Sequence, residues 1–536
     1  MPKAKQALCL LLALVLAMAF FACAPAGGAA APDEAVTIRL AAPQNGNILD
    51  FETNAYKLWL EEQTGLKLEM TWLPQEDAGQ IVHQQLLSGD GLPDAYIGFG
   101  SSDVFGNSNL EAYAARSTVI ALDTLIEAHG ENLNSLFEEL PEYSIRPLMT
   151  AADGHFYYMP GFSSSLITRY RQVMWVNKGW LDTLGLPVPA TTEDFRGMLL
   201  AFRDGDPNGN GLQDEIPLAG TEATYAKQVY DFLFNAFIYN NEKNARLLLE
   251  DGAIGFAPVQ DEWREALQYM RGLYDEGLIS PLSFTQDDQQ LAQMANDPRD
   301  ILGAFASPGI TLTVLQNSPE MMERYVGIGP LAGPKGVQLA SVSIPLPKPN
   351  GVITSACRHP EAVFRLFDLM LSEEACLMGR YGEQGVDWNF APAGAVSIYG
   401  TPATIEIIHQ LWNTPQNKHL MQIGPYVSRP QYSGGVTWSG STTDGEYMNA
   451  QAALLYQAYE PEEFVGVLIY TSEEEAQIQD IRAGIEAHVR QAAIHFITGA
   501  RDITDDAAWQ SHIAEYDALG LQTFLAVAQA ACDRSR

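Results

Sequence analysis

Apolar and polar residues alternate along three short stretches near the start of the chain, and stretches with a helical pattern separate them. Alternation with a period of two residues is typical of strands, and apolar residues three and four positions apart are typical of amphipathic helices. The predicted strands span 36–41, 66–73 and 94–99, and the predicted helices span 54–64 and 78–87. This order predicts a mostly parallel sheet with helices on both faces, which binds ligands where its strands end. Those ends are residues 42–47 and 100–103.

Beyond residue 153 the pattern becomes mainly helical. Long amphipathic helices are predicted over 261–275, 360–371, 473–496 and 505–519, and strand-like pieces over 173–177, 326–329 and 339–346. Gly277, Gly499 and Gly520 each follow one of these helices, at the position where glycine commonly ends a helix. The last strand-like piece, 339–346, is where the chain is expected to return to the first lobe.

The length of the chain sets the number of domains. A chain of 536 residues exceeds what one hydrophobic core supports, so at least two domains are expected. We expect a first α/β lobe over 36–165 with a return segment at about 340–400, and a helix-rich second lobe over 166–339 and 401–536.

The N-terminal residues have the features of an export signal. Two lysines precede an uncharged apolar run over 7–21, which is too short to span a bilayer of roughly 30 Å and is typical of a signal peptide. Residues 1–22 are therefore predicted to be cleaved. Cys23 follows an alanine as in a bacterial lipobox, which predicts a lipid anchor at Cys23; ordinary cleavage close by is the alternative. The Ala-, Gly- and Pro-rich stretch 23–35 would then be a flexible tether.

The charge balance narrows the classes of partner. The chain has 31 Lys and Arg residues against 66 Asp and Glu residues, a formal net charge of −35. This balance argues against binding to nucleic acid or to an anionic lipid surface, and it makes a strongly anionic ligand less favourable. The alternative is that the charge only keeps an exported protein soluble.

The sequence contains no recognisable catalytic motif. It lacks a Gly-x-Ser-x-Gly elbow, a His-Glu-x-x-His motif, a Walker A loop and a Gly-x-Gly-x-x-Gly segment after a strand. Cys357, Cys376 and Cys532 form no disulfide or zinc spacing, and we expect them to be small buried hydrophobes. The chain is therefore predicted not to be an enzyme. A carboxylate pair for glycoside hydrolysis stays open, since the distance between two carboxylates cannot be read from a sequence.

The most specific local signal is an oxygen-rich loop that begins at residue 206. Its side-chain oxygens come from Asp206, Asn208, Asn210, Asp214 and Glu215. Gly211 permits the sharp turn that brings them around one centre, and the Leu212 carbonyl is placed to add a further oxygen. Calcium takes six to eight oxygen ligands, so the loop predicts a structural Ca²⁺ site. The twelfth position of a true EF-hand is occupied here by Pro217, so Glu215 would supply the bidentate carboxylate. The alternative is an Asx-rich turn without metal.

Aromatic and polar residues in irregular stretches are the candidates for ligand binding. Sugars stack on aromatic faces while amides, carboxylates and guanidinium groups satisfy their hydroxyls. The candidate ligand-binding residues are Asn45, Tyr170, Arg171, Glu383, Asp387, Trp388, Trp412 and Trp438. Local packing is the alternative for each tryptophan. If the segment 167–178 is extended throughout, Arg169 and Arg171 lie on one face and Tyr170 on the other; a solvated edge is the alternative there.

Several segments together resemble a known protein family. The blocks that carry the resemblance are 86–94, 175–189 with 191–195, 206–217 and 381–388, and weaker echoes lie at 151–160, 273–279 and 496–500 with Trp509. The chain is similar to the family 1 extracellular solute-binding lipoproteins of ABC transporters, in particular the branch with the alginate-oligosaccharide-binding proteins. The similarity spans nearly all of the chain after the leader.

The resemblance implies a two-lobed α/β fold of the periplasmic-binding-protein type (type II), with the ligand cleft between lobes joined by a hinge. It implies capture of a solute for ABC permease subunits, and together with the loop aromatics it predicts a sugar or oligosaccharide as the ligand, although the branch serves diverse sugars and the particular ligand does not carry over. We expect the protein to be a monomer. The resemblance also implies calcium in the loop at 206–215 and places the segment that ends in Trp388 close to the cleft. The alternatives are a peptide or amino-acid binding protein of the same fold, or a protein that presents its ligand to a membrane sensor. A polyuronate ligand is disfavoured by the acidic balance.

Overall fold

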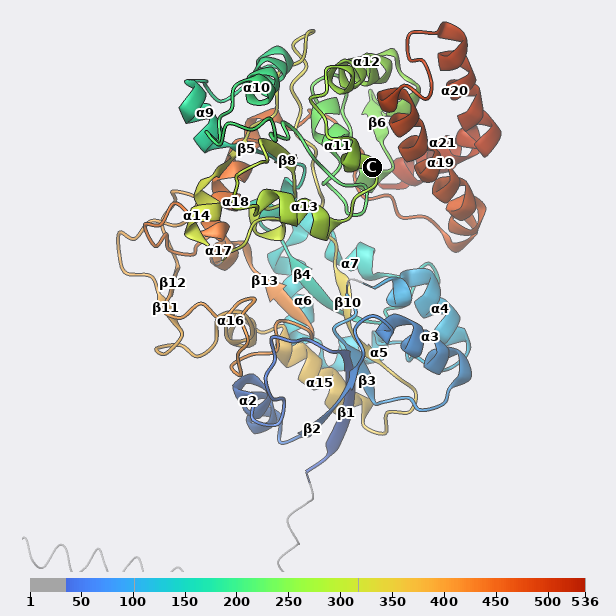
Figure 1. Cartoon of the computed structure of the whole chain (residues 1–536). Helices are drawn as coiled ribbons and strands as arrows, with labels where there is room; N and C mark the ends of the chain where they lie inside the picture. Colours follow the sequence, from blue (N-terminus) through green and yellow to red (C-terminus); the bar gives the residue numbers. More distant parts are fainter. Residues whose placement is uncertain (1–34, 101, 317, 536) are drawn as a thin grey trace, which may run out of the picture.

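Two separate hydrophobic cores organise the chain. The computed structural model describes residues 35–100, 102–316 and 318–535; the predicted signal peptide and lipid anchor Cys23 lie outside this part. One core is formed by residues of 38–162 and 352–376 together with Leu420 and Val427, and the other by residues of 170–342 and 448–528. The first lobe is blue and cyan at the bottom of Figure 1, and the second lobe lies above it, with the C-terminal helices in red.

The first lobe is built on a six-stranded sheet with the order β13-β4-β10-β3-β1-β2. Its strands are β1 (Thr37–Pro43), β2 (Lys67–Leu73), β3 (Ala95–Ile97), β4 (Met159–Ser163), β10 (Lys348–Ile353) and β13 (Tyr426–Ser428). Its helices are α2 (Ala55–Thr64), α3 (Ala78–Ser88), α4 (Asn107–Ala115), α5 (Asp123–His129), α6 (Glu131–Glu139), α7 (Ile145–Met149), α15 (Pro360–Met370) and α16 (Glu373–Tyr381). β1 runs parallel to β2 and β3, as the sequence predicts, whereas β10 runs antiparallel to its neighbours β3 and β4.

The local sequence explains the first β-α-β unit. Ile38 and Leu40 of β1 are buried while Arg39 between them is exposed, so the alternation reflects a sheet with one covered face. Asn54 caps α2, since its side chain accepts hydrogen bonds from the backbone amides of residues 56 and 57. Gly65 ends the helix in the left-handed conformation with φ 69°, which costs a residue without a Cβ atom little.

The second lobe has a smaller sheet and more helix. Its three-stranded sheet has the order β8-β5-β9, formed by β5 (Met174–Asn177), β8 (Ala304–Ala306) and β9 (Tyr325–Ile328), and β6 (Leu247–Glu250) pairs with β7 (Ala253–Phe256) in a hairpin. The helices are α9 (Lys178–Leu184), α10 (Thr192–Asp204), α11 (Val229–Phe234), α12 (Asp261–Asp275), α13 (Asp288–Ala295), α14 (Pro319–Glu323), α18 (Gly445–Leu454), α19 (Ser472–Thr498), α20 (Asp506–Leu519) and α21 (Leu521–Ser535). None of the helices in the described residues combines the length and apolar character needed to cross a bilayer.

The chain passes between the two cores three times. It leaves the first core after Phe162 and enters the second at Tyr170; it returns between Val342 and Val352, and crosses again after Val427. The crossing segments are therefore 163–169, 343–351 and 428–447. The first contains the short helix α8 (Leu166–Arg169) and the third contains α17 (Pro430–Ser433). Beside them, β11 (Trp388–Phe390) and β12 (Ile405–Ile407) form a separate hairpin with a small core of its own.

Two expectations from the sequence differ from the structure. No strand forms over 339–346, because this alternation reflects burial of Ala340 and Val342 against the second core, and β10 begins only at Lys348. The segment around β13 belongs to the first lobe, since Leu420 and Val427 lie in its core and β13 pairs with β4. The assignment of all of 401–536 to the second lobe is therefore wrong for this segment, whose three-residue strand is too short to show a period.

Candidate functional site

The oxygen-rich loop lies in the second lobe, directly after α10. Gly209 and Gly211 adopt left-handed conformations with φ of 68° and 74°, and the amide of Gly211 donates to both carboxylate oxygens of Asp206 at 3.3 and 3.2 Å. The Asp214 Oδ1 atom accepts hydrogen bonds from the side-chain amides of Asn208 and Asn210 at 3.3 and 2.9 Å. The loop thus folds back on itself, as a single cation-binding centre requires.

Glu215 adds a third carboxylate to the loop. Its Oε1 atom is buried and has no hydrogen-bond partner among the described residues. Burial raises the pKa of Glu215, and the negative charges of Asp206 and Asp214 raise it further, so these carboxylates lie close together. Arg299 pairs with Asp214 Oδ2 at 3.4 Å, whereas Glu215 Oε1 has no such partner among the described residues. A cluster of three carboxylates with two amide side chains fits a calcium ion. The side chain of Leu212 is 57% exposed, and its amide donates to Asn210 Oδ1 at 2.7 Å.

A cavity of about 550 Å³ lies where the three crossing segments meet. Ser164, Ser165, Leu166 and Arg169 line it from the first crossing, Pro345 from the second, and Pro430, Gln431, Ser433, Gly434 and Gly435 from the third. The remaining lining residues are Tyr143, Tyr399, Thr401, Pro402, Thr404, Leu454 and Gln457. Its volume falls in the range of small-molecule sites, and both lobes contribute to its wall.

The cavity has hydrogen-bonding groups that the protein leaves unused. The hydroxyl oxygens of Ser164 and Tyr399 are buried and form no hydrogen bond of good geometry among the described residues, although the Ile167 amide lies beside the Tyr399 hydroxyl. Buried polar groups are nearly always paired, so these two hydroxyls would gain a partner if a polar occupant of the cavity drew them toward it. Hydroxyls and tyrosine rings on the same wall are the combination that carbohydrate binding uses.

The sequence predicted that Arg169 and Tyr170 lie on opposite faces if the segment 167–178 is extended, but the structure shows a different arrangement. Residues 166–169 form a helical turn instead of an extended strand, and both side chains donate hydrogen bonds to the carboxylate of Glu460. This arrangement lowers the pKa of Glu460 and raises that of Arg169. Tyr170 is only 2% exposed and stacks on Tyr456 at 5.8 Å, so it packs in the core, whereas Arg169 lines the cavity.

Arg171 belongs to a group of positive charges drawn from both lobes. Desolvation lowers the pKa of Arg171, and in the described part of the chain its guanidinium forms no hydrogen bond or ion pair. Desolvation also lowers the pKa of Lys348, the first residue of β10, and the charges of Arg171 and Lys243 lower it further. Lys243 lies over the ring of Tyr225 at 4.5 Å. Arg171 is not among the residues that line the cavity.

Trp388 and Asp387 hold the β11 hairpin together. Trp388 is 3% exposed, its Nε1 donates to the Gly382 carbonyl at 2.9 Å, and its ring packs against Phe390. The buried Asp387 carboxylate accepts from the Glu383 amide at 2.9 Å. In this structure both side chains are occupied by local packing, which was the alternative considered for the tryptophan.

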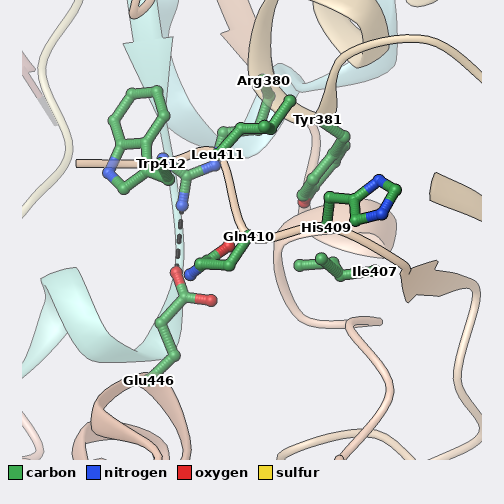
Figure 2. A pocket seen from close by; sticks show the side chains of 8 residues that line it. All are labelled: Arg380, Tyr381, Ile407, His409, Gln410, Leu411, Trp412 and Glu446. Carbon is green, nitrogen blue, oxygen red and sulfur yellow. Dashed lines mark hydrogen bonds and ion pairs between the residues drawn. The ribbon is translucent and has the colours of Figure 1, made fainter. Parts of the chain in front are cut away.

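Trp412 is covered by an arginine. Figure 2 shows Arg380 beside the Trp412 ring, with a hydrogen bond to Glu446. The guanidinium carbon lies 3.6 Å from the ring centroid, and His419 stacks on the same indole at 6.1 Å. The pocket that Arg380, Trp412 and Glu446 help to line has a volume of about 10 Å³, roughly the space of one water molecule. A sugar ring does not fit there.

The other predicted ligand residues are dispersed. Trp438 stacks on Tyr447 at 4.9 Å but keeps 38% of its surface exposed. Asn45 closes its own turn by accepting from the Asn47 amide at 3.0 Å, and the Glu383 side chain is exposed. The sequence analysis missed Ser164 and Tyr399, because single hydroxyl residues in irregular segments have no pattern. A usable signal was the Ser-rich run directly after the strand β4.

Comparison with known proteins identifies the architecture. Over 336 residues the chain is 31% identical to the fructooligosaccharide ABC transporter substrate-binding protein FusA of Streptococcus pneumoniae, covering 61% of this chain and 59% of FusA, less than two thirds of that relative. The solved structure of FusA with kestose has a TM-score of 0.73 at 24% identity and covers 93% of this chain and 99% of that one.

Two further structures share the fold. An extracellular solute-binding protein from Bifidobacterium longum subsp. infantis has a TM-score of 0.75 at 18% identity, over 94% of this chain and 99% of that one. The alginate-binding protein AlgQ2, solved without calcium ion, has a TM-score of 0.65 at 17% identity, over 94% and 98%. The fold is thus the two-lobed α/β fold of periplasmic binding proteins. The model of the bacterial extracellular solute-binding proteins matches residues 45–375, and the chain belongs to this family.

Proposed function

We propose that this protein is the substrate-binding component of an ABC importer and captures a sugar or oligosaccharide between its lobes. The observation that carries the proposal is the cavity at the three crossing segments, whose wall includes the unpaired hydroxyls of Ser164 and Tyr399. A ligand that bridges segments from both lobes stabilises the closed arrangement more than an open one, so binding shifts the population toward closure. FusA, whose name states a fructooligosaccharide substrate, supports the choice of sugar.

The proposal also covers the attachment of the protein to the membrane and its transport partners. The protein acts without catalysis as a monomer, is attached outside the cytoplasm through a lipid on Cys23, and transfers its ligand to permease subunits. A peptide or amino-acid ligand, or presentation of the ligand to a membrane sensor, is the competing function.

A panel of neutral and acidic glycans, peptides and amino acids tests the ligand class. A ligand raises the melting temperature by mass action, so glycans should raise it and peptides should leave it unchanged. The Tyr399→Phe variant removes only the unpaired hydroxyl and should weaken glycan binding about tenfold in calorimetry, the loss of roughly one hydrogen bond. Tyr432→Phe is the matched control, because the Tyr432 hydroxyl donates to Glu373 and the residue is outside the cavity lining.

A response to peptides alone would replace sugar by peptide as the ligand. Equal glycan affinities of the two tyrosine variants would remove the cavity from the binding site. Release of smaller sugars from a bound glycan over hours would contradict a purely binding role.

We propose in addition that the loop over 206–215 binds calcium as a structural ion. Asp206, Asn208, Asn210, the Leu212 carbonyl, Asp214 and Glu215 would hold it, and the ion would neutralise carboxylates that now repel one another. Solved relatives described as a FusA EF-hand mutant and as AlgQ2 without calcium ion support this choice of metal. Chelation should lower the melting temperature, and calcium should restore it. A double substitution, Asp206→Ala with Asn210→Ala, should abolish this response; a persisting response would place calcium elsewhere.

A further inference from the structure

A second cluster of metal-ligand side chains lies far along the chain from the calcium loop, between two C-terminal helices. His488 is on α19, and His512 and Glu515 lie three positions apart on α20, so both face the same neighbour. One ligand atom from each of the three residues lies within 4.8 Å of the other two. The helices pack side by side in the red part of Figure 1.

One nitrogen of each imidazole in this cluster is buried and forms no hydrogen bond among the described residues. His512 is only 1% exposed; its Nε2 lies 3.2 Å from the Pro258 carbonyl oxygen, to which it donates. The lone pair is therefore on Nδ1, and Nδ1 is buried without a partner among the described residues. His488 Nε2 is likewise buried and forms no hydrogen bond there, although Glu515 Oε2 lies 3.3 Å away. The hydroxyl of Tyr516 is also buried without a hydrogen bond among the described residues, and its ring contacts both imidazoles at 4.8 and 4.9 Å.

These observations point to an ion that the ring nitrogens share. A histidine that binds a metal through one nitrogen usually donates its other N–H to a carbonyl or carboxylate, which is the arrangement of His512 and Pro258. We propose that His488, His512 and Glu515 form a zinc site that clips α19 to α20. Two imidazole nitrogens and one carboxylate oxygen are zinc ligands, whereas calcium takes oxygen ligands.

The distances suit zinc. At zinc–ligand distances of about 2.0–2.1 Å, two ligands of a tetrahedral ion lie roughly 3.3 Å apart. His488 Nε2 and Glu515 Oε2 are 3.3 Å apart. The three ligand atoms lie within 4.8 Å of one another, so the third ligand would have to move slightly closer to reach the same ion. A water molecule would take the fourth position.

The protonation states already suit a metal. Burial lowers the pKa of His488 and lowers that of His512 to about 4, so both rings are neutral near pH 7. Hydrogen bonds from Arg501 lower the pKa of Glu515, and its carboxylate is ionised. Arg501 holds that carboxylate through Nη1 to Oε2 at 2.9 Å and Nη2 to Oε1 at 3.0 Å. Arg501 is thus a positioning residue, and zinc binding need not displace a proton.

Metal analysis of the protein without its predicted signal peptide, residues 1–22, tests the site. The protein is stripped with a chelator, given one equivalent of zinc in excess calcium, passed through a desalting column and analysed for metal. We expect one zinc per chain and a higher melting temperature. His488→Gln should lose both, while His495→Gln should keep both, since His495 lies exposed on the same helix. Cobalt in place of zinc should give the visible absorption of a tetrahedral site in the parent and not in His488→Gln.

Other outcomes would overturn the proposal. No retained zinc in the parent, or equal zinc in the parent and in both His488→Gln and Glu515→Gln, would exclude this cluster. Loss of zinc in the Asp206→Ala, Asn210→Ala double variant, with retention in Glu515→Gln, would place the ion in the calcium loop. Glu515 is half-buried, so its variant keeps the test valid if His488→Gln fails to fold. None of these results depends on whether the protein binds sugar.

Discussion

Two regions of this molecule combine aromatic rings, arginine and hydroxyl or amide groups, and only one of them is open. At the three crossing segments a cavity of about 550 Å³ has Arg169 in its wall and two hydroxyls without partners. Around Trp412 the pocket measures about 10 Å³, Arg380 covers the indole, and Glu446 pairs with Arg380 at 3.0 Å. The two regions differ in whether their polar side chains already have hydrogen-bond partners within the protein.

This contrast shows what composition alone leaves undecided. A tryptophan in a glycine-rich segment is equally compatible with stacking on a ligand and with closing a small core of its own. Trp388 does the second, since its Nε1 hydrogen bond and its contact with Phe390 use both its polar and its apolar parts. Unpaired buried hydroxyls are the better marker of a ligand site, because the cost of leaving them unpaired needs a compensating partner.

The largest expected effect comes from removing Trp388 from the small core of the β11 hairpin. This core adjoins the closed region through Tyr381, which lines the pocket at Trp412. Trp388→Ala removes a side chain that is 3% exposed together with its hydrogen bond, and we expect a loss of about 3–5 kcal/mol in the free energy of unfolding. Phe390→Ala is the matched control, since Phe390 is 53% exposed and should cost much less. Urea denaturation measures both. If the folded Trp388→Ala variant lost glycan affinity, the hairpin core would be part of the binding site.

The sequence predicted regular elements well and the site only in part. The β-α-β-α-β unit, the long helix α12 and the caps at Gly499 and Gly520 depend on local periodicity and turn chemistry, which a sequence displays directly. The cavity depends on three segments that meet from residues 164, 345 and 431, and no local pattern records that meeting. The oxygen-rich loop over 206–215 could be recognised because its candidate ligands are contiguous in the sequence, and calcium binding there stays a prediction. The pair His488 and His512 could not be recognised, because the two lie on different helices.

A medium effect is expected at the arginine beside the open cavity. Hydrogen bonds from Arg169 lower the pKa of Glu460 in the folded state. A carboxylate with a lowered pKa contributes stability that is present above its unfolded value of about 4.3 and is lost as pH falls through the folded pKa. Glu460→Gln should therefore cost about 1 kcal/mol at pH 7, since both partners are partly exposed, and progressively less below about pH 4.

Chemical denaturation of the parent and Glu460→Gln at pH 7, 4 and 3 measures this difference directly. Glu462→Gln serves as the control, because Glu462 is exposed, and its stability should follow the parent at every pH. A cost for Glu460→Gln that stays constant from pH 7 to pH 3 would mean that shape, and not charge, holds Arg169 in the cavity wall.

The smallest expected effect tests whether the closed region takes any part in binding. Glu446→Gln removes the charge that pairs with Arg380, and both side chains are partly exposed, at 34% and 21%. Surface ion pairs of this kind contribute about 0.5 kcal/mol, and the stacking of Arg380 on Trp412 is left in place. We therefore expect a small loss of stability, unchanged tryptophan fluorescence and unchanged glycan affinity in calorimetry. A pocket of about 10 Å³ has room for one water molecule at most, so a clear loss of glycan affinity in this variant would require the region to open in solution and would end its distinction from the cavity.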